Sequence, residues 1–313
     1  MSPSSQLHVV IGSSGGAGNA IARALVDAGL TTRAVNRSGA ADLPGHIEQV
    51  AADITTGEGL ARAVGGAGVV YMAAQPPYHR WPEQFPTMLS GVIDATAAAG
   101  AKLVMVDNLY GYGPATGPMT EDSPQRASDR KGVVRRTMAE TLLAAHQSGR
   151  LRVTIGRASD YFGPRADNSG ITALAVAPAA SGGTIRWLGT LDAAHSAAYL
   201  PDVARAYVTL GTSDRADGEV WLLPHAPAVT GREFLALVNQ ALPAPARQGV
   251  VSPAMLRLAA PFHRVSRQSL GILYQWTEPF VVDHAKFERA FGPVAVTPLR
   301  DAIETTVAWY RRR

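Results

Sequence analysis

The stretch that most constrains the fold is LHVVIGSSGGAGNAIARAL at residues 7–25. The apolar, β-branched run at 7–11 is typical of a parallel strand buried on both faces. A glycine-rich turn follows, and apolar residues then recur at helical spacing from Ala20 to Leu25. Strand, glycine turn and helix in this order predict a dinucleotide site, because the bare backbone and the helix N-terminus can hold a pyrophosphate. The alternative is a structural turn without a ligand. The residues expected at this site are Gly12, Ser14, Gly15, Gly16, Ala17 and Gly18.

The end of a second strand, at 31–36, bears on which dinucleotide binds. An NAD-selective site usually has a carboxylate there for the ribose 2′-hydroxyl, whereas this chain has Asn36, Arg37 and Ser38. Arg37 can bind a 2′-phosphate through two hydrogen bonds, so we expect NADP rather than NAD. The alternative is that Arg37 stacks on the adenine or faces water.

Two further loops complete the expected cofactor site. Asp53 and Ile54 follow a short third strand at 47–50 and are expected at the adenine edge, unless Asp53 only caps a helix. A fourth strand at 68–74 ends on small residues that let the backbone meet the cofactor. These positions are Ala73 and Ala74, followed by Gln75, with Gln75 and Tyr78 as candidates for contact with the substrate.

The alternation of strands and helices continues to the middle of the chain, with strands at 101–107 and 151–156 and a helix at 126–148. Such alternation predicts an α/β fold with a doubly wound parallel sheet. Beyond Pro164 the pattern loosens, and Thr230 and Glu233 form a capping box that opens a helix at 230–242. We expect a Rossmann domain over 1–165, to which 196–224 returns, and a smaller substrate-binding lobe over 166–195 and 225–313.

Composition limits the class of protein. Of the 313 residues, 46% are hydrophobic and 17% charged, which is typical of a folded protein, and the net charge of +4 favours anionic ligands over nucleic acid. The absence of cysteine excludes disulfides and thiolate chemistry. Histidine spacing predicts no metal site. No signal peptide or membrane-spanning run is present, so we expect a cytoplasmic monomer or homodimer that binds a small molecule and no membrane.

The chain resembles the extended and atypical short-chain dehydrogenase/reductases, the NAD(P)-dependent epimerase/dehydratase family, over nearly its whole length. The resemblance implies a Rossmann fold and a catalytic Ser or Thr with a Tyr-x-x-x-Lys pair, in which the tyrosine moves a proton and the lysine lowers its pKa. The motifs that carry it are GSSGGAG (12–18), DI (53–54), YG (112–113), TEDSP (120–124), RASDYFGP (157–164), DV (202–203) and TPLRDAI (297–303).

The chain departs from that catalytic set. Anchored on the YG pair, the Ser/Thr position falls on Asn108. The Tyr-x-x-x-Lys window falls on 132–136, which puts Gly132 at the tyrosine and Arg136 at the lysine. No tyrosine occurs between Tyr112 and Tyr161, so no register restores the motif. An ordinary alcohol dehydrogenase mechanism is therefore not expected, and another group must move the proton.

The resemblance also suggests which residues replace the missing pair. Nucleotide-sugar relatives have an asparagine at the position of Asp160 and a diphosphate-binding arginine at the position of His195, so a nucleotide sugar is not the expected substrate. Asp160 and His195 instead form a candidate acid/base pair, with Asn108 holding the substrate oxygen. The alternatives are that Asp160 caps a turn and that His195 binds a backbone carbonyl. Further candidate proton donors are Tyr161, Tyr110 and Tyr112.

These observations predict an NADP(H)-dependent oxidoreductase or isomerase that acts on a small, largely apolar carbonyl or hydroxyl compound. Trp276, Tyr274 and Phe280 are candidates to roof its substrate site. Two alternatives stay open. One is a non-catalytic NADP(H) sensor, and the other is a lyase or isomerase that reuses the fold without net redox change.

Overall fold

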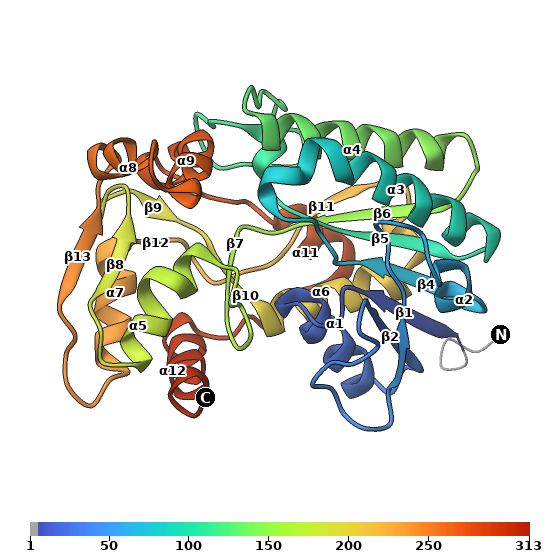
Figure 1. Cartoon of the computed structure of the whole chain (residues 1–313), viewed down its shortest axis with the longest axis horizontal. Helices are drawn as coiled ribbons and strands as arrows, with labels where there is room; N and C mark the ends of the chain where they lie inside the picture. Colours follow the sequence, from blue (N-terminus) through green and yellow to red (C-terminus); the bar gives the residue numbers. More distant parts are fainter. Residues whose placement is uncertain (1–5) are drawn as a thin grey trace.

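The computed structural model describes residues 6–313, with the backbone alone for Arg264 and Val265. A parallel sheet of seven strands, in the order β11-β6-β5-β4-β1-β2-β3, forms the centre of the larger domain (Figure 1). This confirms the predicted doubly wound α/β fold. The strands are β1 (Leu7–Ile11), β2 (Thr32–Asn36), β3 (Glu48–Ala51), β4 (Ala67–Met72), β5 (Lys102–Asp107), β6 (Arg152–Arg157) and β11 (Val220–Leu222).

Helices cover both faces of this sheet (Figure 1). On one face lie α2 (Leu60–Val64), α3 (Trp81–Ala98) and α4 (Arg130–Gln147), and on the other α1 (Gly16–Asp27) and α6 (Leu200–Thr212). Successive residues of β1 serve the two faces in turn, since Val9 and Ile11 join one apolar cluster and Val10 the other. Consecutive apolar residues are therefore required in this strand, because both faces of the sheet are buried.

The order of the strands shows where on the carboxyl edge of the sheet a ligand is expected to bind. The connections from β1 run to β2 on one side and, by way of β3, to β4 on the other. The carboxyl ends of β1 and β4 therefore flank the point where the winding reverses, which is where open α/β sheets bind ligands. The backbone N–H of Ala73 donates to Ile11 O (2.9 Å), so the two strand ends stay together there.

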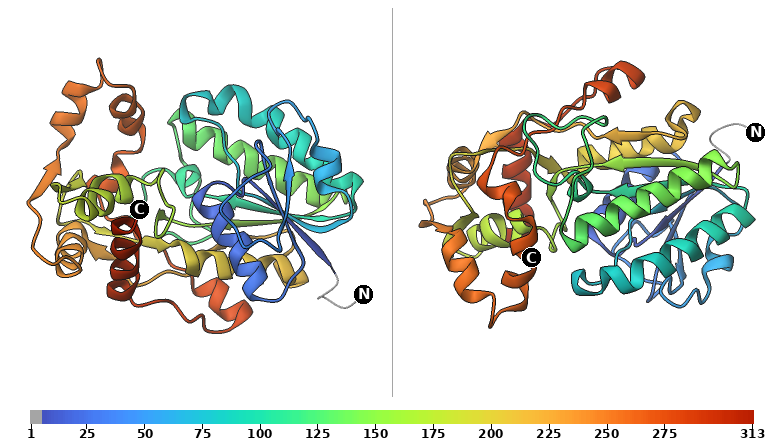
Figure 2. Two further views of the ribbon diagram at one scale, coloured as in Figure 1. Left: turned by 60° about the horizontal axis from the view of Figure 1, so that its bottom comes forward. Right: turned by 90° about the horizontal axis from the view of Figure 1, so that it is seen from above.

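The smaller lobe is built from three two-stranded sheets and short helices around its own apolar cluster (Figure 2). Thr230 caps α7 (Gly231–Gln240) through the predicted capping box. The paired strands are β7 (Asp160–Phe162) with β10 (Ala197–Tyr199), β9 (Ala194–His195) with β12 (Val229–Thr230), and β8 (Ile185–Leu188) with β13 (Gln248–Val251). The helices are α5 (Ala177–Ala180), α7 (Gly231–Gln240), α8 (Pro253–Ala259), α9 (Arg264–Ser269), α10 (Tyr274–Thr277) and α12 (Leu299–Arg311), with a π-helical turn at Thr172–Val176. Single 3-10 turns lie at Tyr78–Arg80, Tyr110–Tyr112, Asp214–Ala216 and Leu270–Ile272.

Two predicted boundaries differ from the structure. Helix α4 begins at Arg130 rather than at 126, because the Asp129 carboxylate accepts the backbone N–H groups of Lys131 and Gly132 and caps the helix there. Helix α11 (Ala285–Phe291) lies in the segment assigned to the lobe, but its Phe287 packs on Trp221 of the sheet domain, with ring centroids 6.3 Å apart. The expected lobe boundary at 225 does not hold for this helix.

No helix in the described part of the chain is both long enough and apolar enough to cross a membrane.

Candidate active site

The glycine turn after β1 is packed tightly at two of its glycines and open at the third. Gly12 has a φ of +91°, and a Cβ there would lie 2.6 Å from Ala74 N. A Cβ at Gly18 would lie 2.3 Å from Gly12 O, so only glycine lets α1 approach the turn. A Cβ at Gly15 would meet only Gly12 O, at 3.5 Å, and Gly15 is exposed. Gly12 and Gly18 therefore shape the turn, while Gly15 leaves its backbone bare and exposed.

The start of α1 fits a phosphate group. Gly15 is the N-cap residue, no side chain caps the helix, and no acidic residue lies in its first turn. The first N–H groups of the helix are thus left without side-chain partners at its positive end. Ser14 beside them is exposed, whereas Gly16 packs against Arg165, where a Cβ would lie 2.5 Å from the carbonyl oxygen. The donor set matches the pyrophosphate of a dinucleotide.

The end of β2 contributes one positioning residue and one exposed cation. Asn36 is buried, its side-chain amide donates to Ser13 Oγ (3.0 Å), and its Oδ1 accepts the Ser38 backbone N–H (3.1 Å). Asn36 therefore holds the glycine turn in place through one N–H of its amide, and its contact with the cofactor stays a prediction. Arg37 next to it is exposed.

The loop after β3 takes the form of a turn. Asp53 Oδ1 accepts the backbone N–H of Thr55 (2.8 Å), and Ile54 is buried in the core. Helix α2 does not begin until Leu60, so Asp53 caps a turn and not the helix suggested as its alternative role.

The two sequence-predicted acid/base residues lie in direct contact. Asp160 begins β7, His195 ends β9, and Asp160 Oδ2 is 3.0 Å from His195 Nε2. His195 Nδ1 is 3.0 Å from the carbonyl oxygen of Gln275, which can only accept, so Nδ1 carries a hydrogen. A single proton is then shared between Nε2 and Oδ2. His195 is 2% exposed and Asp160 18%, so the carboxylate is the member that faces outward.

Aromatic rings enclose the imidazole of His195. Trp276 stacks on it at 4.6 Å between ring centroids, Phe280 stacks at 5.4 Å, and Trp187 meets it edge-on at 5.7 Å. Trp276 and Phe280 are themselves buried, so they wall in His195 rather than roof an open site as predicted. Tyr274 is half-buried, and burial raises its pKa to about 12.

A buried cluster with surplus positive charge lies where β5 and β6 end. Asp107 at the end of β5 accepts from Arg157 Nε at the end of β6 (2.9 Å) and from Arg135 Nη1 on α4 (3.3 Å). All three side chains are at most 4% exposed. Arg157 Nη1 and Nη2 and Arg135 Nε have no hydrogen-bond partner among the described residues. Two guanidinium groups thus share one carboxylate.

Helix α4 presents a different pair of residues from the predicted window. Arg135 donates to Gln75 Oε1 (3.0 Å), and Lys131, one turn earlier, places Nζ 4.6 Å from the Tyr78 ring centroid. Burial lowers the pKa of Lys131 to about 8. Gly132 instead faces the Tyr110 carbonyl, where a Cβ would lie at 2.5 Å. Gly132 thus has no room for a side chain, and Lys131 and Arg135, at i, i+4 spacing, make the contacts with Tyr78 and Gln75 instead.

The remaining candidates lie at the same strand edge or turn away from it. Asn108 follows β5, and its Oδ1 accepts the Tyr110 backbone N–H (3.1 Å). The Tyr110 hydroxyl lies 3.3 Å from that of Tyr78. Tyr161 neighbours Asp160 on β7 and points to the opposite side, where it packs on the second apolar cluster. Its hydroxyl is buried without a partner among the described residues, and burial raises its pKa to about 12. The structure thus separates Tyr161 from the Asp160–His195 pair.

The ring of Tyr112, a further candidate donor, lies under the Arg157 guanidinium.

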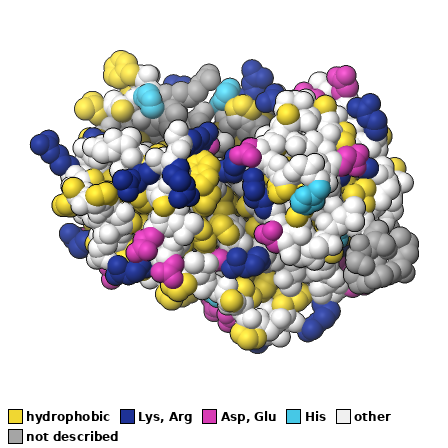
Figure 3. Space-filling view, turned by 90° about the horizontal axis from the view of Figure 1, so that it is seen from below, with side chains coloured by type: hydrophobic (Ala, Val, Ile, Leu, Met, Phe, Trp, Pro, Cys, Tyr) yellow, Lys and Arg dark blue, Asp and Glu magenta, His cyan; other side chains and the backbone are white. Residues whose placement is uncertain are grey.

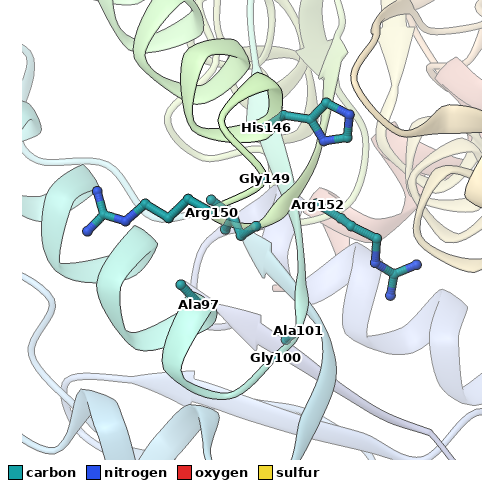
Figure 4. Close-up of a pocket in the computed structure, with 8 residues that line it drawn as sticks. Ala97, Gly100, Ala101, His146, Gly149, Arg150 and Arg152 are labelled. Carbon is teal, nitrogen blue, oxygen red and sulfur yellow. The ribbon is translucent and has the colours of Figure 1, made fainter.

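Two hollows lie away from these residues. Figure 3 shows an apolar hollow rimmed by basic side chains, a groove of about 600 Å³ that α1, α6 and Trp309 line. Figure 4 shows a hollow of about 270 Å³ at the amino ends of β5 and β6, from which Arg150 and Arg152 point in opposite directions. Neither includes Asp160 or His195 in its lining.

Comparison with known proteins gives one family and a shared fold. A sequence model of the NAD dependent epimerase/dehydratase family matches residues 8–223. No curated protein matches the chain in sequence. Similar solved structures include the UDP-glucose 4-epimerase of Thermus thermophilus in complex with NAD (TM-score 0.78, 18% identity) and the UDP-glucuronic acid 4-epimerase of Bacillus cereus with UDP-glucuronic acid and NAD (0.80, 15%). A third is the UDP-glucose 4-epimerase of Thermotoga maritima with UDP-glucose (0.79, 16%), and each alignment covers 98% of this chain and 99% of the other.

Proposed function

Because the chain belongs to the NAD dependent epimerase/dehydratase family, we propose that it is an NADP(H)-dependent oxidoreductase or isomerase in which Asp160 moves the proton. Family membership makes a nicotinamide dinucleotide the cofactor class. The substrate class in this proposal is a small, largely apolar carbonyl or hydroxyl compound.

The single observation that carries the proposal is the contact of Asp160 with His195. Asp160 Oδ2 is engaged by the imidazole, and no described residue donates a hydrogen bond to Oδ1. That oxygen can take the proton of a substrate hydroxyl and return it to a carbonyl oxygen in the reverse direction. His195 is a positioning residue, since the Gln275 carbonyl fixes its tautomer and the surrounding rings fix its plane.

Asn108 is proposed to hold the substrate oxygen. Its Oδ1 is taken by the Tyr110 backbone N–H, which orients the amide and leaves its NH2 group as a donor at the edge of the sheet. When bound, the nicotinamide supplies the hydride acceptor or donor. The residues proposed to hold the dinucleotide are the glycine turn with Ser14 and Ala17, then Asn36, Arg37 and Ser38, Asp53 and Ile54, and Ala73, Ala74 and Gln75.

The choice of NADP rests on Arg37. No acidic side chain stands at the end of β2, and the exposed Arg37 guanidinium is free to reach a 2′-phosphate. The likeness to NAD-bound epimerases, at 15–18% identity, concerns the fold and not this position.

The proposed substrate differs from a nucleotide sugar for an electrostatic reason. A diphosphate placed near Asp160 would meet an outward-facing carboxylate, and the neighbouring His195 is buried and already bonded at both nitrogens. Trp276 and Phe280 are buried against His195, so they make the surroundings behind Asp160 apolar without lining a substrate site themselves.

Calorimetric titration with NADPH and NADH tests the cofactor, and a panel of carbonyl compounds with NADPH tests the reaction. We expect NADPH to bind about tenfold or more tightly than NADH, and its absorbance to fall with at least one carbonyl substrate. Absence of binding by either nucleotide at millimolar concentration would overturn the proposal. Tight binding without turnover of any substrate would replace it with a sensor role.

A further inference from the structure

Three large apolar side chains stand in solvent on one hairpin of the lobe, residues 252–269, which we term the α8–α9 hairpin. Met255 is 57% exposed, Leu258 78% and Phe262 91%. Among the side chains that the structure describes, no other large apolar group is exposed to this degree. The hairpin is anchored from its inner side, where Leu256 packs into the lobe core. Its exposed face is therefore available without unfolding.

The chain segment that carries this face is basic. Residues 234–277 contain no aspartate, glutamate or lysine, but they contain Arg247, Arg257, Arg264 and Arg267. These four arginines equal the net charge of +4 of the whole chain, so the rest of the protein is balanced. Arg257 and Arg267 are exposed. Asp129, the N-cap residue of α4, places one carboxylate beside the inner end of this segment, since a Cβ on Gly271 would lie 3.3 Å from its Cβ.

We propose that the α8–α9 hairpin is a docking surface for an anionic lipid bilayer. Exposed apolar side chains enter the boundary between headgroups and acyl chains, and neighbouring cations bind the phosphates. A second copy of this chain fits less well, because a two-fold contact through the hairpin would bring two arginine-rich segments without acidic residues together. This inference revises the sequence-based expectation that the protein has no membrane partner.

The hairpin projects from the lobe and connects to the candidate active site. Figure 2 (left) shows the orange segment standing clear of the sheet helices. At its end, the Gln268 carbonyl accepts from Lys131 Nζ (2.6 Å), and the chain continues directly to Gln275, which holds His195. A docked protein would therefore present this site near the bilayer. The substrate class that follows, a carbonyl or hydroxyl compound dissolved in lipid, rests on the proposed function.

Vesicle sedimentation without cofactor tests the surface. The full-length protein is expected to bind vesicles of phosphatidylcholine with ~30% phosphatidylglycerol, to bind phosphatidylcholine alone at least about tenfold less, and to be released by high salt. The triple variant Met255→Ser/Leu258→Ser/Phe262→Ser should lower the partition coefficient at least about tenfold. Arg257→Glu/Arg267→Glu should lower it similarly, whereas Arg289→Glu/Arg312→Glu, with the same change of net charge at exposed positions elsewhere, should not.

Three outcomes would overturn the inference: no binding of the wild type to anionic vesicles, equal binding by the triple serine variant, or equal loss in both charge-reversal variants. Loss of self-association in the triple variant, with no lipid binding by the wild type, would assign the surface to a protein contact instead. Circular dichroism checks that each variant is folded. NADPH affinity, measured without lipid, tests the proposed function separately, so failure of one result does not imply failure of the other.

Discussion

The carboxylate of Asp160 and the imidazole of His195 lie 3.0 Å apart although 35 residues separate them in the chain. A backbone carbonyl fixes the other imidazole nitrogen, so the two side chains share one proton. The outward member is the carboxylate, and we therefore propose Asp160 as the proton carrier and His195 as its positioning residue.

This assignment predicts different effects for the two residues. Asp160→Asn should lower kcat by about 100-fold or more, because an amide cannot take the proton. His195→Gln should lower kcat less and should displace the pH profile, since it removes only the partner that orients the carboxylate. Steady-state kinetics across pH checks both, with NADPH affinity within about twofold of wild type as the control. Full activity of Asp160→Asn would exclude it as the proton carrier.

Arg37→Ala is expected to weaken NADPH binding by about 10- to 100-fold, because a charge-assisted contact with the 2′-phosphate is lost. NADH binding should not change, since NADH lacks that phosphate. Arg62→Ala removes an equal, exposed charge on α2 and serves as the matched control. Equal weakening of both nucleotides would show that Arg37 does not select between them. Calorimetry measures all four affinities.

Two glycines of the turn are expected to have different effects: Gly18 on the stability of the fold and Gly15 on cofactor binding. Gly18→Ala should destabilise the fold by about 1–3 kcal/mol, because its Cβ would lie 2.3 Å from Gly12 O. Gly15→Ala should cost less than about 1 kcal/mol but weaken cofactor binding by about tenfold, because its Cβ has room in the protein and not beside a phosphate. Urea unfolding and nucleotide titration distinguish the two. Unchanged cofactor affinity in Gly15→Ala would contradict the assigned pyrophosphate position.

The buried cluster of Asp107, Arg135 and Arg157 predicts an asymmetry in stability. Asp107→Asn leaves two buried guanidinium groups without a counter-charge and should lower the free energy of unfolding by about 3–5 kcal/mol. Arg157→Met should cost less, because it removes the surplus charge together with two donors that lack partners. Urea unfolding of both variants at one pH compares the two losses of unfolding free energy. A larger loss in Arg157→Met than in Asp107→Asn would show that the excess of cations does not destabilise the cluster.

The buried imidazole of His8 is expected to make the fold less stable in acid. Burial lowers its pKa from the ordinary 6.5 to about 4. The unfolded chain therefore takes up this proton below pH 6.5 while the folded chain does not, so the free energy of unfolding falls by about 1.4 kcal/mol per pH unit between 6.5 and about 4. His8→Gln should lack this component. Chemical denaturation of both proteins between pH 4 and 7.5 measures it, and parallel curves would exclude His8 as its source.

The sequence by itself determined the first strand, the glycine turn and the first helix, and through them the doubly wound fold. These features depend on neighbours in the chain: alternating burial in β1, glycines where backbone meets backbone at Gly12 and Gly18, and the capping box at Thr230. Asp160 and His195 were also found in sequence, because each replaces a different residue type at a position that the resemblance marks.

Only the tertiary structure decided which side chains meet. The rotation of α4 is set by its packing on the sheet, and it turns Lys131 and Arg135, not 132 and 136, toward the site. Asn36 donates a hydrogen bond to Ser13, and Tyr161 packs on the second apolar cluster, away from Asp160. The residues that these two side chains contact lie far along the chain. A sequence pattern fixes the local backbone, but the orientation of a side chain toward a distant partner depends on how whole elements pack.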